Sequence, residues 1–214
     1  MNPGELALFG TAFAVVFFSW LWSYSRRPTA QSRRAAAPGL GLEYLSEGTR
    51  EPPTTEFMPV LWNAAQTSIH YMFRNSMSGR VGSDSIWLFD LDVIRQGHGD
   101  AMMSSQTVVL IKTGGGAFPV FKVIPWKAAA EKSVDIDLPF LKTHTLIAES
   151  KGPVADMFLK AGSGFLRGET GWAIEGGGQW LVFCRHDKLI PSLELKAFLE
   201  DALRLRGSLL SAQT

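Results

Sequence analysis

The hydrophobic and polar positions divide the chain into an uncharged apolar stretch, a short polar segment and a longer region of alternating pattern. The uncharged stretch runs from Leu6 to Ser25. Twenty helical residues at about 1.5 Å each cover about 30 Å, the thickness of a bilayer core. A helix also satisfies all of its own backbone polar groups inside lipid. The pattern therefore predicts a transmembrane anchor over residues 1–27.

The residues at the end of this stretch support the prediction. Trp20, Trp22 and Tyr24 are amphipathic aromatic residues of the kind found in the headgroup zone, and Arg26 and Arg27 follow them. We therefore expect these five side chains to form the membrane interface of the anchor.

A cleaved signal peptide is the alternative for this stretch. Such a peptide needs positive charge before its apolar run and small residues just after it. Only Glu5 is charged before the run, and Ala35–Ala37 lie too far beyond it. The arginine bias then predicts a single-pass protein of the plasma (inner) membrane, with the N-terminus outside and the C-terminal domain in the cytoplasm.

Proline, glycine and small polar residues fill positions 28–53, which are predicted to be a linker. Arg33 and Arg34 lie in this segment. We expect both to contact anionic lipid headgroups, although the plainer interpretation is that they only mark the cytoplasmic side. A cytoplasmic domain over residues 54–214 follows.

Within that domain the pattern is mainly that of strands. Trp87, Phe89, Leu91 and Val93 alternate with polar residues, as in a half-buried strand. The glycine triplet 176–178 between two apolar runs indicates a hairpin. Strands are expected over residues 69–80, 84–95, 105–112, 118–124, 145–148, 172–175 and 179–185, and short helices over 54–66 and 154–160.

The chain closes with a predicted amphipathic helix from Pro191 to Arg206, ended by Gly207. Strands with short connections and helices at the ends predict an α+β fold, an antiparallel β-sheet domain with a C-terminal helix.

The total charge says little by itself, but its distribution along the chain is informative. The formal net charge of the 214 residues is +1. Residues 26–42 hold four arginines and no acid, so the rest of the chain is slightly acidic. Without a basic surface, nucleic acid is not an expected partner. The single cysteine, Cys184, excludes an internal disulfide.

Several short motifs occur in order along residues 70–206. They are residues 75–79 (NSMSG), 89–90 (FD), 106–108 (QTV), 118–121 (FPVF), 171–175 (GWAIE) and 181–183 (LVF), with Pro191 before the terminal helix. In this order they resemble an uncharacterised group of bacterial proteins, many of which have N-terminal membrane segments. The resemblance implies a fold and a topology but assigns no catalytic residue.

The best candidate for chemistry is the pair Asp90 and Asp92. A spacing of two places both carboxylates on one face of a strand, where they could hold a hard cation together with His98 and Asp100. The plainer interpretation is that they mark the solvated face of an antiparallel strand.

Other motifs point away from catalysis. The triplet Gly114–Gly116 lacks the lysine and helix of a phosphate loop. Cys184 lies in an apolar strand, and His186 on the same strand face has no third partner. No cofactor is expected.

Three functions remain open. The leading hypothesis is a non-catalytic interaction domain, an accessory subunit or assembly factor with protein partners in the membrane. The alternatives are a membrane-tethered metal-dependent enzyme that uses Asp90, Asp92, His98 and Asp100, and a lipid-sensing module that acts through Arg33 and Arg34.

Overall fold

The computed structural model describes residues 28–45, 69–96, 101–126, 137–162, 166 and 171–213. Its helices are α2 (Ala30–Ala36), α4 (Lys151–Ala161) and α5 (Leu195–Ser211), with 3-10 helices η1 (Ala37–Leu40), η3 (Pro139–Lys142) and η4 (Ser192–Glu194). Its strands are β1 (Glu43–Tyr44), β2 (Ile69–Val81), β3 (Asp84–Gln96), β4 (Ala101–Lys112), β5 (Phe118–Pro125), β6 (His144–Ala148), β7 (Trp172–Gly178) and β8 (Trp180–Arg185).

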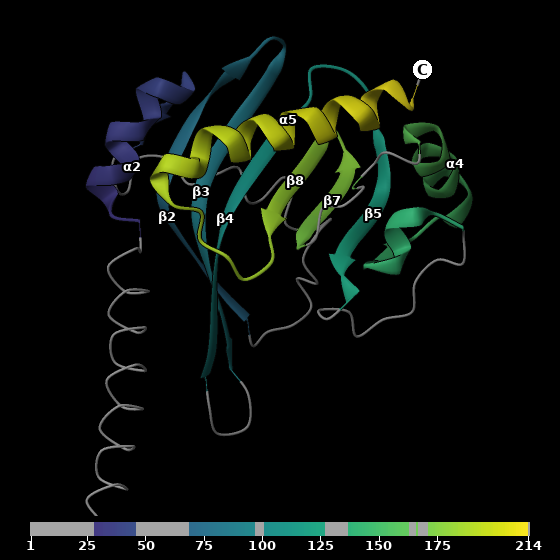
Figure 1. Ribbon diagram of the computed structural model, residues 1–214, viewed down its shortest axis with the longest axis horizontal. Helices are drawn as coiled ribbons and strands as arrows, with labels where there is room; N and C mark the ends of the chain where they lie inside the picture. Colours follow the sequence, from purple (N-terminus) through teal and green to yellow (C-terminus); the bar gives the residue numbers. More distant parts are fainter. Residues whose placement is uncertain are drawn as a thin grey trace, which may run out of the picture.

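The strands form one eight-stranded sheet in the order β1-β2-β3-β4-β8-β7-β5-β6, and all neighbours are antiparallel. The long strands β2, β3 and β4 form a meander whose lower end extends past the rest of the sheet (Figure 1). The predicted α+β fold with an antiparallel sheet and a C-terminal helix is confirmed.

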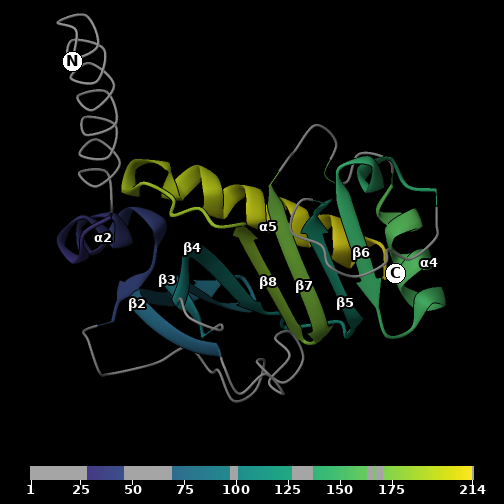
Figure 2. The ribbon, with the colours of Figure 1, turned by 90° about the horizontal axis from the view of Figure 1, so that it is seen from below.

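Helix α5 crosses one face of the sheet, with α2 beside β2 and α4 near β5 and β6 (Figure 2). The indole of Trp172 stacks on Phe198 of α5 with ring centroids 5.2 Å apart. Arg206 of α5 pairs with Asp84 at the start of β3. The large, fully buried side chains of the main core are Trp172, Phe121, Phe158, Phe183, Met77, Ile86 and Leu88.

A second apolar cluster lies on the opposite face. It includes Phe89, Leu91 and Val93 of β3, while Ile86 and Leu88 of the same strand belong to the main core. Successive strand residues point to opposite faces, so these two sets of β3 side chains lie on opposite sides of the sheet. Both sets are buried. This strand is therefore covered on both sides at its centre, which the alternating pattern alone did not predict.

The segment 28–53 is not a plain linker in its described part. Residues 30–40 form α2 and η1, and Glu43 and Tyr44 pair with Ser78 and Met77 of β2. Residues 29–44 therefore belong to the folded domain, although they lie upstream of its predicted start at residue 54.

Two further boundaries differ from the prediction. Helix α5 continues through Gly207 to Ser211 because Leu209 and Ala212 beyond it are buried, and this packing outweighs the helix-breaking tendency of one glycine. Glycines 176–178 belong to β7, and only Gly178, with φ +57°, takes the positive φ of the hairpin turn.

The predicted anchor over residues 1–27 and the predicted helix 54–66 lie outside the described residues. Among the helices that are described, none has the length and apolar character needed to span a membrane.

Candidate functional site

The two aspartates singled out by the sequence lie on the face of β3 that carries α2. Asp90 is 1% exposed and Asp92 is 2% exposed. The interpretation that they mark a solvated face is therefore wrong. The strand pattern predicted correctly that they share a face, but it could not show that α2 and the segment before α5 cover that face.

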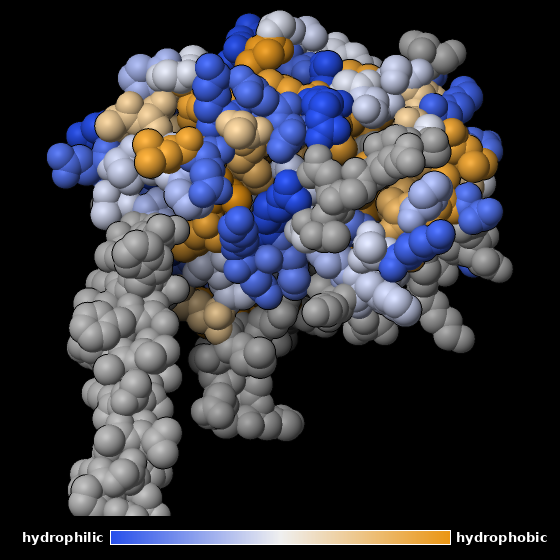
Figure 3. All heavy atoms as spheres, viewed as in Figure 1, coloured by the Kyte–Doolittle hydropathy of each residue, from blue (hydrophilic) through white to orange (hydrophobic). Residues whose placement is uncertain are grey.

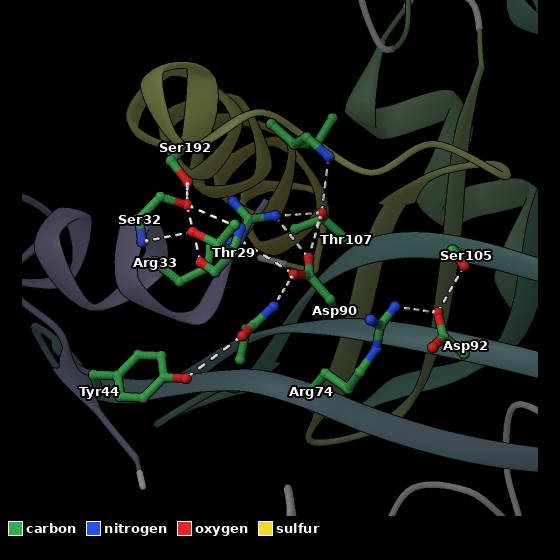
Figure 4. Close-up of polar contacts among 12 residues, drawn as sticks. Thr29, Ser32, Arg33, Tyr44, Arg74, Asp90, Asp92, Ser105, Thr107 and Ser192 are labelled. Atoms are coloured by element: carbon green, nitrogen blue, oxygen red, sulfur yellow. Dashed lines mark hydrogen bonds and ion pairs between the residues drawn. The ribbon is translucent and has the colours of Figure 1, made fainter. Parts of the chain in front are cut away.

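Asp90 is the acceptor at the centre of a buried polar cluster (Figure 4). Arg33 of α2 donates from Nη2 to Oδ1 at 2.7 Å and from Nε to Oδ2 at 3.2 Å. Asn75 of β2 donates from Nδ2 at 2.8 Å, and Thr107 of β4 from Oγ1 at 2.7 Å. Arg33 itself is fully buried. A two-pronged contact of this kind fixes the orientation of the guanidinium as well as neutralising the charge.

Local backbone structure places two of these donors. Thr29 caps α2: its hydroxyl accepts from the backbone N–H of Ser32, and the Ser32 hydroxyl accepts from that of Thr29. Asn75 sits at a β-bulge between Arg74 and Met77 with φ +53°, a conformation that asparagine tolerates better than most residues. The bulge lets the amide of Asn75 reach Asp90 on the neighbouring strand.

Thr107 extends the cluster to the segment before α5. The Ile190 backbone N–H donates to its hydroxyl at 2.9 Å, and its own N–H donates to the Lys188 carbonyl at 3.0 Å. Ser192 Oγ lies 3.0 Å from Ser32 Oγ of α2. The cluster therefore joins α2, the three strands β2–β4 and the entry into α5.

Asp92 has separate partners. Arg74 donates from Nη2 to Oδ1 at 2.7 Å, and Ser105 donates from its hydroxyl to the same oxygen at 2.6 Å. The side chain of Arg74 remains 45% exposed. Each aspartate thus has an arginine as its cation.

The proposed cation ligands His98 and Asp100 lie outside the described residues. In the part of the chain that is described, no three His, Cys, Asp or Glu side chains come close enough to hold a metal ion. The geometry of Asp90 is that of a structural contact between segments, because both of its oxygens already accept hydrogen bonds.

The expectation that Arg33 contacts lipid headgroups is wrong, because Arg33 is buried against Asp90. Arg34 is exposed, and its guanidinium carbon lies 5.2 Å from the centre of the Tyr44 ring. The predicted interface residues Trp20, Trp22, Tyr24, Arg26 and Arg27 lie outside the described residues. Thr29 is of a residue type that favours a helix start, but a cap does not indicate which of the two neighbouring arginines is buried.

Cys184 is buried in β8, and burial together with the nearby charge of Glu175 raises the pKa of its thiol far above the usual value. His186 is exposed and lies 3.3 Å from Asp187. The thiol is therefore held protonated, which is the opposite of what a nucleophile needs.

The resemblance to an uncharacterised bacterial group stays a prediction. No protein-family model, no curated protein and no solved structure was found to match this chain.

Proposed function

We propose that the protein is a single-pass protein of the inner membrane whose α+β domain is an interaction module held close to the cytoplasmic surface. The observation that supports this most is the buried pair between Arg33 and Asp90. Arg33 follows the uncharged stretch 6–25 by only eight residues. An anchor in that stretch would thus connect almost directly to a helix fixed on the sheet.

The length of the connection limits how far the domain can move. Five residue steps separate Ser25 from Ala30, the first residue of α2. At about 3.5 Å per extended residue the connection reaches about 17 Å at most. A flexible linker through residue 53 would allow several times this distance. Because α2 is folded onto the sheet, the connection is short and the domain stays close to the anchor.

The groups described in the domain favour binding over catalysis. Asp90 and Asp92 accept hydrogen bonds from arginines, and the Cys184 thiol is buried. These three side chains, the candidate acids and nucleophile that fall in the described residues, therefore have structural roles. An accessory subunit or assembly factor of a membrane complex is the version of this function that we favour.

Membrane extraction tests the anchor. The full chain should stay in the pellet after alkaline carbonate washing of membranes. The double variant Val15→Arg/Val16→Arg should move to the soluble fraction, because each central arginine costs about 3 kcal/mol in the bilayer. The matched control Val15→Leu/Val16→Leu should behave like the parent. Release of the parent chain by carbonate would contradict the proposal.

Chemical crosslinking in intact membranes, followed by purification in mild detergent, tests the interaction module. We expect a stoichiometric membrane partner to accompany the chain. A chain that purifies alone after crosslinking, or one that turns over a substrate in a manner dependent on Asp90, would contradict a binding role.

A further inference from the structure

Two methionines are exposed at the end of the meander where β2 begins. Met72 of β2 is 50% exposed and Met103 of β4 is 56% exposed. Met72 lies opposite Asp92, and Met103 lies opposite Ile94 two residues further along β3. Because directly paired residues of antiparallel strands share a face, both methionines lie on the face that carries Asp90 and α2.

The path of the chain shows which end of the sheet faces the N-terminal stretch. Arg33 lies at the level of Asp90, which pairs with Arg74, whereas Glu43 pairs with Ser78. From Arg33 to Glu43 the chain thus advances along β2 toward the strand's far end. The described residues before Arg33, 28–32, therefore lie toward the end where β2 begins, in agreement with the position of the start of α2 beside the meander (Figure 1).

The methionines lie within reach of an anchored membrane surface. Met72 is two residues from Arg74 along β2, or about 7 Å. The connection to the uncharged stretch spans about 17 Å at most. An anchor over residues 6–25 would therefore place the bilayer surface next to this end of the meander.

Other side chains at this end have the character of a membrane interface. Strand β5 runs in the direction of β3, so Trp126, which follows β5 and is 69% exposed, lies at the same end of the sheet. Tryptophan prefers the headgroup zone. The side chain of Arg74, two residues from Met72 on β2, is 45% exposed although its guanidinium pairs with Asp92. On the helix-bearing face, blue hydrophilic spheres are common over α5, and orange and tan apolar spheres occur both near α2 and the strands below it and near α4 (Figure 3).

We propose that the surface formed by Met72 and Met103 rests on the lipid surface of the membrane that holds the anchor. This proposal rests on the proposed function. Methionine is flexible and apolar, and such side chains adapt well to an irregular surface. The folded domain would then have a fixed orientation, with the Met72 end toward lipid and the Val81 end of β2 toward the cytoplasm.

The test uses the full chain in nanodiscs of phosphatidylcholine and phosphatidylglycerol in equal amounts. Met72→Cys and Met103→Cys variants carry an environment-sensitive fluorophore, and native Cys184 is too buried to react. The matched control is Val81→Cys, which is 41% exposed on the same strand. It lies nine residues beyond Met72, or about 30 Å.

We expect lipids with a quencher in the headgroup region to lower the fluorescence at positions 72 and 103 about twofold or more relative to position 81, because of that 30 Å separation. Equal quenching at all three positions would overturn the proposal. Shielding of position 72 only in discs that hold two copies of the chain would also overturn it, in favour of a self-interface. Failure of the chain to enter the discs would instead refute the membrane anchor itself.

Discussion

The buried pair of Arg33 and Asp90 makes a quantitative prediction about stability. Arg33→Met keeps much of the side-chain volume but leaves a carboxylate 1% exposed with only Asn75 and Thr107 as donors. Removing one partner of a buried ion pair costs about 3–5 kcal/mol. That is a large share of the roughly 5–15 kcal/mol by which domains are stable.

Two further variants separate charge burial from lost packing. Asp90→Asn in the Arg33→Met background removes the unpaired charge, so the double variant should be less destabilised than the sum of the single variants by about 1–3 kcal/mol. Arg204→Met breaks the exposed pair with Asp201 on α5, where the distance is 3.3 Å. This control should lose less than about 1 kcal/mol.

The measurement is urea unfolding of the full chain in detergent micelles, followed by tryptophan fluorescence, since Trp172 lies fully buried in the core. If Arg33→Met lost no more stability than Arg204→Met, the cluster would not hold α2 on the sheet. The proposal that α2 holds the domain close to the membrane anchor would then lose its support.

Three other predictions concern the core and the buried titratable groups. Gly176→Ala should destabilise the domain by about 1–3 kcal/mol, because the new methyl group would overlap the Phe121 ring. Gly207→Ala should stabilise the domain by about 0.5–1 kcal/mol, because there is open space at that position in α5. Equal urea midpoints for the two variants would contradict this. Burial lowers the pKa of His144 below its usual 6.5, so the unfolded chain takes up a proton first as the pH falls below 6.5. The free energy of unfolding should therefore drop over that range and His144→Gln should flatten the drop, whereas an identical pH profile for parent and variant would refute a buried neutral histidine. Because burial raises the pKa of the Cys184 thiol, a thiol reagent at neutral pH should label it only after urea is added, and prompt labelling of the folded chain would show that the thiol is accessible.

The local pattern was sufficient for the main elements of the sheet. The alternation in residues 84–95 predicted β3, and the apolar runs around Gly176–Gly178 predicted the β7–β8 hairpin. These elements are local, because period-two burial and turn chemistry depend on neighbours within a few residues. The sequence likewise showed that Asp90 and Asp92 share a strand face.

What the sequence by itself determined is the strands β2 to β8, the terminal helix, and an uncharged stretch long enough to cross a membrane; the short strand β1 was not among them. Only the tertiary structure decided which polar residues are buried. Arg33 and Arg34 look equivalent in the chain, yet one is buried against Asp90 and the other is exposed, because α2 docks with one side on β3. Asp90 and Arg33 are 57 residues apart, so no local pattern could relate them. A contact at that separation exists only once the sheet has brought β2, β3 and β4 together and given the helix a surface to cover.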